Sequence, residues 1–121
     1  MNAGDTFIDG KYRHLWIVLS DPVLDPDNVV IVNLTTHTMD EESHCILEKG
    51  EHPFVKHKTA VRYRDAKCVS VAHLDKLVEK RLLTCHSSLS VTVLRKVRKG
   101  AGLSEFLPEG CRQILDDQGL I

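Results

Sequence analysis

Two uninterrupted apolar stretches dominate the first third of the chain. Residues 14–20 read HLWIVLS and residues 29–34 read VVIVNL, both rich in aromatic and β-branched side chains. This composition is typical of β-strands, and the lack of polar–apolar alternation indicates that both faces of each strand are covered. The polar segment between them contains Asp21-Pro22 and Asp25-Pro26, which favour turns. We therefore predict a central antiparallel pair of buried strands.

Shorter strands surround this pair. Residues 4–8 form the first, and the dipeptide Asp9-Gly10 after them is typical of a tight turn. Residues 35–43 are polar, end in acidic side chains and predict a loop. Three more short strands follow, over residues 45–47, 60–63 and 67–71. Asp65 falls between the last two, where we expect the chain to bend.

The second half of the chain changes to helical spacing. Apolar residues between 71 and 82 recur at intervals of three and four, which predicts a short helix. A loop is expected over residues 84–88, with Ser87 or Ser88 capping a helix that Gly100 would end. Pro108 suits the first turn of a last helix that ends at Gly119. The pattern predicts an antiparallel α+β fold over residues 1–121, a small bent sheet or barrel with C-terminal helices.

Composition and charge narrow the functional classes. The 121 residues carry 16 Lys+Arg against 17 Asp+Glu, which excludes a strongly basic nucleic-acid binder but not a local basic patch. No stretch resembles a signal peptide or approaches the ~20 apolar residues of a membrane span. We therefore expect a cytoplasmic protein that does not associate with membranes. Its four cysteines are expected to be free, buried and unreactive in that reducing compartment.

The densest chemistry lies in residues 50–66, GEHPFVKHKTAVRYRDA, which combine two histidines, four cations and a tyrosine. His57 stands between Lys56 and Lys58. It is the first candidate for general acid–base catalysis, because an imidazole titrates near neutrality, at about 6.5, and nearby cations lower that value. The alternative is a histidine that is simply hydrogen-bonded at a strand end. Glu51 and Asp65 are available to pair with neighbouring cations.

Arg62 and Arg64 are two residues apart on a predicted strand and so share a face. Two guanidinium groups on one face suit a phosphate, although a solvated face paired with Asp65 or Glu51 is the competing interpretation. Thr35, at the end of an apolar run, offers a hydroxyl donor. A metal site remains an alternative, but the neighbours His44 and Cys45 would face opposite ways on a strand, so no metal or cofactor is expected.

The order of these features resembles the MazF/PemK-like growth-inhibitor toxins of bacteria. Four segments carry the resemblance: Gly4-Asp5 opening the first strand, the run at 14–20, the run at 30–36 that ends in two threonines, and residues 57–61. The family fold is a small SH3-like barrel with helices. The resemblance implies this fold and a metal-independent endoribonuclease activity in which the ribose 2′-hydroxyl is the nucleophile.

The resemblance also implies roles for particular residues. Thr35 falls on the threonine that ends the family's apolar run, and His14 falls where the family has a phosphate-binding arginine, beside Arg13. Arg62 lies close to a second arginine of some members, and Arg64 stands where some have aspartate. The predicted catalytic set is His57, Arg62, Thr35 and His14. The predicted phosphate-binding set is Arg13, Arg64 and Lys58.

Two functions from different classes follow. The first is a toxin-like endoribonuclease with an RNA substrate, an antitoxin partner and a homodimeric state. The basic residues at positions 95–99 would then be either a solvated helix face or a docking site for an acidic antitoxin segment. The second is the same barrel used as a non-catalytic binding or regulatory module.

Overall fold

The computed structural model describes residues 1–121 as an α+β fold with six strands and three helices. The elements are β1 (Thr6–Asp9), β2 (Leu15–Val18), β3 (Asn28–Thr36), β4 (Ile46–Leu47), β5 (Thr59–Ser70), α1 (Val71–Glu79), β6 (Leu83–His86), α2 (Val91–Leu103) and α3 (Glu109–Asp117). The sheet has the order β4-β5-β3-β2-β1-β6, and every pair in it is antiparallel.

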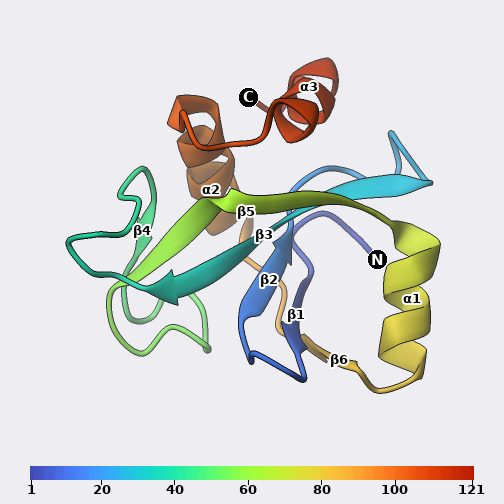
Figure 1. Cartoon of the computed structure of the whole chain (residues 1–121), viewed down its shortest axis with the longest axis horizontal. Coiled ribbons are helices and arrows are strands. Elements are labelled where there is room, and N and C mark those ends of the chain that lie inside the picture. Colours follow the sequence, from blue (N-terminus) through green and yellow to red (C-terminus); the bar gives the residue numbers. More distant parts are fainter.

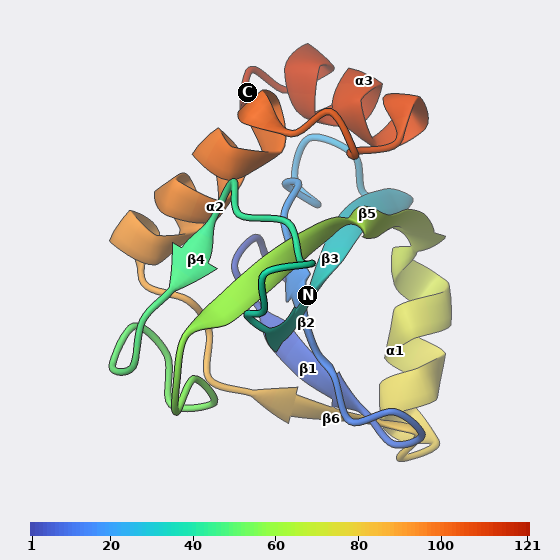
Figure 2. The same cartoon turned by 60° about the vertical axis from the view of Figure 1, so that its left-hand side comes forward.

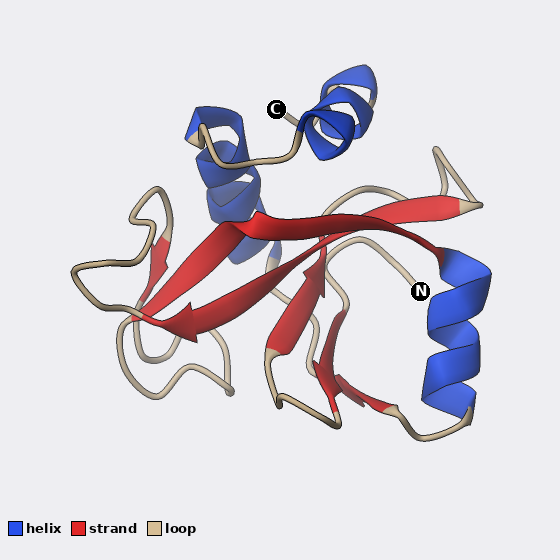
Figure 3. Ribbon diagram, in the orientation of Figure 1, coloured by secondary structure: helices blue, strands red, loops and turns tan.

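The sheet curls into a half-barrel. Figure 2 shows the long β3–β5 ribbon running across the direction of the shorter β1–β2 pair. The helices α2 and α3 lie together on one side of this ribbon, whereas α1 stands apart beside the end of β5 (Figures 1 and 3). None of the three helices has the length and apolarity that a membrane span requires.

The central strands bury both faces, as the sequence predicts. Alternate residues of β2 and β3 belong to two separate clusters. Leu15, Ile17 and Val32 join the larger one, which α2 and α3 cover. Trp16 and Ile31 join the smaller one, which is closed by residues of α1 and β6. A strand with two covered faces has no solvent face to keep polar, which explains the unbroken apolar runs.

Several predicted boundaries are wrong. Residues 35–36 were expected in a loop, but they extend β3 and pair with the start of β5. The two strands predicted on either side of Asp65 are one strand, because a bulge opposite residues 31–33 absorbs the extra residues without ending the pairing. Residues 84–88 were expected in a loop, but residues 84–86 belong to β6, which forms because β1 offers it an unpaired edge, and only residues 87–88 are outside a strand.

The helical predictions also need correction. The helix α1 ends at Glu79 rather than near Leu82, and Ser90, not Ser87 or Ser88, caps α2. Gly100 does not end α2, which continues to Leu103. The glycine is required by packing, since a Cβ there would lie 2.2 Å from the hydroxyl of Tyr63 and 2.8 Å from Cβ of Cys45.

Tyr63 is fully buried, and its hydroxyl donates a hydrogen bond to Val97 O at 2.7 Å. The cysteines are all free, but only Cys45 and Cys111 are buried. Cys68 and Cys85 are exposed, contrary to the expectation of four buried thiols.

Candidate functional site

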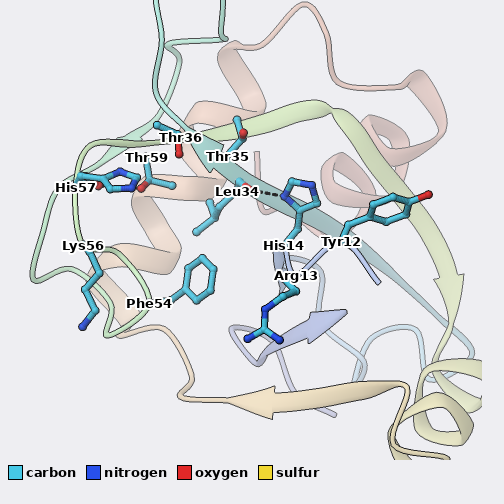
Figure 4. A pocket seen from close by; sticks show the side chains of 10 residues that line it. All are labelled: Tyr12, Arg13, His14, Leu34, Thr35, Thr36, Phe54, Lys56, His57 and Thr59. Carbon is cyan, nitrogen blue, oxygen red and sulfur yellow. Dashed lines mark hydrogen bonds between the residues drawn. The ribbon is translucent and has the colours of Figure 1, made fainter. Parts of the chain in front are cut away.

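Segments far apart in the sequence meet at a surface hollow of about 320 Å³ (Figure 4). We call it the histidine hollow, because both predicted site histidines, His14 and His57, line it. Its lining residues are Tyr12, Arg13, His14, Leu34, Thr35, Thr36, Phe54, Lys56, His57 and Thr59. They come from the β1–β2 turn, the end of β3, the loop after β4 and the start of β5.

Strand pairing explains why these segments converge. Thr35 and Thr36 at the end of β3 pair with Ala60 and Thr59 of β5, so His57 lies directly beyond the paired residues. On the other edge of β3, Trp16 pairs with Asn33. Continuing that register by two residues places His14 opposite Thr35. The sheet therefore sets the two histidines on either side of the threonine, as Figure 4 shows.

Both imidazoles use the same ring nitrogen, Nδ1, to bond a backbone carbonyl. Nδ1 of His14 lies 3.2 Å from Leu34 O, and Nδ1 of His57 lies 3.2 Å from Lys58 O. A carbonyl oxygen only accepts, so each Nδ1 carries a hydrogen and donates it. In the neutral rings, Nε2 is then left as a free base. This arrangement suits one ring to take up a proton and the other, when protonated, to release one.

The charged lining of the histidine hollow is entirely cationic. Arg13 and Lys56 line it, and no carboxylate does. Arg13 is held with a positive φ of 59°, a left-handed conformation that is uncommon for residues other than glycine. The hollow thus combines fixed positive charge with hydroxyl and imidazole groups, a combination suited to an anion such as phosphate.

Asp9 builds the turn that carries Arg13 and His14. Its Oδ1 accepts hydrogen bonds from the backbone N–H groups of residues 11–13, and its Oδ2 accepts from His14 N and Trp16 Nε1. Burial alone would raise the pKa of this carboxyl, but these hydrogen bonds outweigh it and lower the pKa below the usual 3.8. Asp9 was predicted only as part of a tight turn. Aspartate at the start of a turn commonly accepts hydrogen bonds from backbone N–H groups a few residues later. This tendency is the sequence signal from which the role of Asp9 in organising the turn could have been predicted.

We expect Asp9→Asn to lower the free energy of unfolding by about 1–3 kcal/mol at pH 7, because an amide cannot accept from both sets of donors. The folded-state pKa of Asp9 is depressed, so its contribution is present above about pH 4 and is lost as the pH falls through the folded value. Urea unfolding at pH 7 and pH 3 measures both effects. Asp27→Asn, an exposed aspartate outside the hollow, is the control; equal stability of the two variants at pH 7 would contradict the role of Asp9.

Not every predicted site residue lies in the histidine hollow. Of the seven, the hollow brings together Arg13, His14, Thr35 and His57. Lys58 is exposed but does not line it. Arg62 and Arg64 also lie outside it.

The two arginines of β5 are engaged in ion pairs. Nε of Arg62 lies 3.4 Å from Glu41, and its Nη1 lies 3.5 Å from Asp65. Arg64 donates through its backbone N and its Nε to Oε2 of the buried Glu42, at 3.0 and 3.2 Å. The competing interpretation of a face paired with Asp65 therefore holds for Arg62. Glu51 instead pairs with Lys96, at 2.9 Å.

His52 supports the segment that carries His57. It is buried, its Nε2 donates to Ser87 O at 2.6 Å, and its Nδ1 accepts from Phe54 N at 3.0 Å. Burial lowers the pKa of His52 below its usual 6.5, and a neighbouring charge on His86 acts in the same direction, while the bond to Ser87 opposes it. Because both ring nitrogens are used by the neutral form, this histidine is structural and not a proton-transfer group.

We expect the protein to lose stability as the pH falls below about 6.5, since the unfolded chain then binds a proton at His52 that the folded chain resists. Above that pH the contribution of His52 is fully present. Guanidinium unfolding at pH 7.5 and pH 5.5 measures the difference. His52→Gln should flatten the dependence between these values. An unchanged slope in that variant would show that other groups cause it.

Among the lining residues that sequence reasoning missed, three lie in loops. Tyr12 and Phe54 were not assigned a role, and Lys56 was noted only as a neighbour of His57. Their participation depends on how two loops fold over the sheet edge, which no local pattern encodes. No group of three or more metal-ligating side chains comes together in the molecule.

The chain was also compared with known proteins. No protein-family model matches it, and no curated protein sequence matches it either.

Proposed function

We propose that the histidine hollow is the active site of a metal-independent endoribonuclease that cleaves RNA by attack of the ribose 2′-hydroxyl. One observation carries the proposal: His14 and His57 flank Thr35 in the hollow, and each ring is held through Nδ1 by a backbone carbonyl. The lysine and arginine side chains that line the hollow are Arg13 and Lys56, and no carboxylate lines it. Such chemistry needs a base, an acid and a cationic surround for the phosphate.

The proposed reaction divides these roles between the two rings. Nε2 of His57 removes the proton of the 2′-hydroxyl, and the oxygen attacks phosphorus to form a 2′,3′-cyclic phosphate. The bond from phosphorus to the 5′ oxygen breaks, and protonated His14 gives its proton to that oxygen. Arg13 and Lys56 stabilise the charge that develops on the phosphorane, and the Thr35 hydroxyl donates to one of its oxygens.

The test is to incubate the purified protein with structured and unstructured RNA in the presence of EDTA. We expect cleavage to 2′,3′-cyclic phosphate and 5′-hydroxyl ends. The matched substrate with 2′-deoxyribose at every position should remain intact, because it lacks the nucleophile. Intact RNA at high protein concentration would remove the proposal, and cleavage that requires added divalent metal would replace it with a metal-dependent one.

We further propose that the fold is the SH3-like barrel of MazF/PemK-like toxins, in a cytoplasmic protein. The curled antiparallel sheet with helices packed on it supports this, as does the order of the motifs. An antitoxin docking on the basic face of α2 has less support, because Lys96 bonds Glu51 and Arg98 bonds Leu19 O.

A homodimer belongs to the same proposal, since a small barrel with an open strand edge, here β6, commonly pairs. Light scattering at micromolar concentration is expected to return twice the chain mass of 13.6 kDa. The monomer mass would contradict the dimer without bearing on the site.

The second candidate is a non-catalytic module that binds a phosphate-containing ligand in the same hollow. The ion pairs of Arg62 and Arg64 favour it, because they hold these guanidinium groups outside the histidine hollow, away from a phosphorane formed there. Under this alternative, RNA or a nucleotide would bind with an affinity that depends on Arg13 but would stay uncut in the assay above.

A further inference from the structure

A second hollow, of about 440 Å³, adjoins the histidine hollow. We call it the side hollow and define it by Asn33, Arg64, Asp65 and Lys67, together with Tyr12 and His14, which line both hollows. A ligand in the histidine hollow that extends past Tyr12 and His14 therefore enters the side hollow.

The two hollows differ in charge. The histidine hollow has cations and no carboxylate, whereas the side hollow has Asp65 and Asp9 as well as Arg64 and Lys67. Mixed charge does not suit a phosphate, but it suits a planar group that presents both donors and acceptors. The exposed ring of Tyr12, at 69% exposure, stands where such a group could stack.

Asp65 is held with one oxygen engaged and the other unused. Its Oδ2 accepts from Asn33 Nδ2 at 3.3 Å and lies 3.5 Å from Arg62 Nη1. No hydrogen bond or ion pair occupies its Oδ1. These contacts hold the carboxylate through Oδ2 and leave Oδ1 as an acceptor for a ligand.

Asn33 supplies a second acceptor without a partner. The residue is 3% exposed, and its Oδ1 makes no hydrogen bond even though it is buried. Because Nδ2 donates to Asp65, the amide cannot turn around to satisfy this oxygen. The atom is shielded from bulk water, and none of its neighbours donates a hydrogen bond to it. Buried polar atoms without partners are rare, and this one lies in a residue that lines the hollow.

We propose that the side hollow binds a guanine base of the RNA whose phosphate occupies the histidine hollow. Guanine offers two adjacent donors, N1–H and the 2-amino group, which match the two acceptors of Asp65 and Asn33. Its O6 and N7 accept from Lys67 and Arg64, the kind of contact that cationic side chains make to guanine. Adenine and cytosine pair a donor with an acceptor on the same edge, and uracil has a single donor there.

This inference takes its ligand, RNA, from the proposed function. Nucleotide binding can be measured without cleavage, so the two proposals are tested separately. The probes are guanosine, adenosine, cytidine and uridine monophosphates, as both 3′ and 5′ isomers, and inorganic phosphate, titrated by NMR. We expect a guanosine monophosphate to bind about 10- to 100-fold more tightly than the other three bases. Equal affinities, or a preference for another base, would overturn the inference and leave the cleavage proposal to its own assay.

Substitutions in the side hollow test whether the guanine preference arises there. Asp65→Asn and Lys67→Ala should each remove most of the guanine advantage while leaving the affinity for inorganic phosphate unchanged. Asp40→Asn, an exposed aspartate outside both hollows, is the matched control. Lys67→Ala keeps the test valid if Asp65→Asn perturbs the fold, because Lys67 is exposed. Guanine preference that survives both variants would place the base elsewhere and overturn the assignment. Guanine binding without RNA cleavage would support the side hollow and contradict the nuclease.

Discussion

His57→Ala is expected to reduce RNA cleavage in EDTA by about 10²- to 10⁴-fold, the contribution typical of a positioned general acid or base. The side chain is exposed, so its removal should leave the fold intact. His14→Ala should cause a loss of similar size. The double variant should be little worse than either single one, because a base and an acid that act in the same step are not additive. Initial rates on a fluorogenic RNA measure all three.

His44→Ala is the matched control, since His44 is an exposed histidine that does not line the hollow. The wild-type rate should depend on pH as a bell, because one imidazole must be neutral and the other protonated. Each single variant should lose one limb of that bell. Full activity in His57→Ala would leave the hollow without a role in proton transfer.

Gly100→Ala should destabilise the protein by about 1–3 kcal/mol, the range expected when a methyl group is forced into a well-packed core. The added Cβ would lie 2.2 Å from Tyr63 Oη, so the buried ring must move. If this movement breaks the hydrogen bond from Tyr63 to Val97 O, the unpaired buried hydroxyl lowers the free energy of unfolding by about 1–3 kcal/mol more. Thermal and urea unfolding of the two proteins measure the loss.

The control is Gly110→Ala, because Gly110 lies in α3 with nothing within 4 Å of its added Cβ. There the substitution should stabilise the helix by up to about 1 kcal/mol through helix propensity. If Gly100→Ala were as stable as Gly110→Ala, the close packing of α2 on Tyr63 would be wrong.

Local sequence patterns predicted those elements whose structure depends mainly on their own residues. Unbroken apolar runs predicted β2 and β3 as a central pair buried on both faces, and this is confirmed. Helical spacing, capping residues and Pro108 located the three helices, and Gly119 follows the last one with a positive φ of 70°. In each case the residues that form the element also carry the signal, so neighbouring positions suffice.

Predictions failed where a distant partner decides the structure. LTCH at residues 83–86 is short and only half apolar, and it becomes β6 because β1 has a free edge. Gly100 is a plausible helix stop in isolation, but Tyr63, 37 positions earlier, makes it a packing residue within α2. In both cases the partner, β1 for residues 83–86 and Tyr63 for Gly100, lies too far away in the sequence for a local pattern to include it.

The same division applies to the site. The sequence by itself determined which chemical groups are available: the imidazoles of His14 and His57, the hydroxyl of Thr35 and the surrounding cations. Only the tertiary structure decided which of them meet. The register of β2, β3 and β5 brings Arg13, His14, Thr35 and His57 to one hollow, while Glu41, Glu42 and Asp65 draw Arg62 and Arg64 away from it. Side-chain chemistry is a property of single residues, but proximity is set by strand pairing across the whole chain.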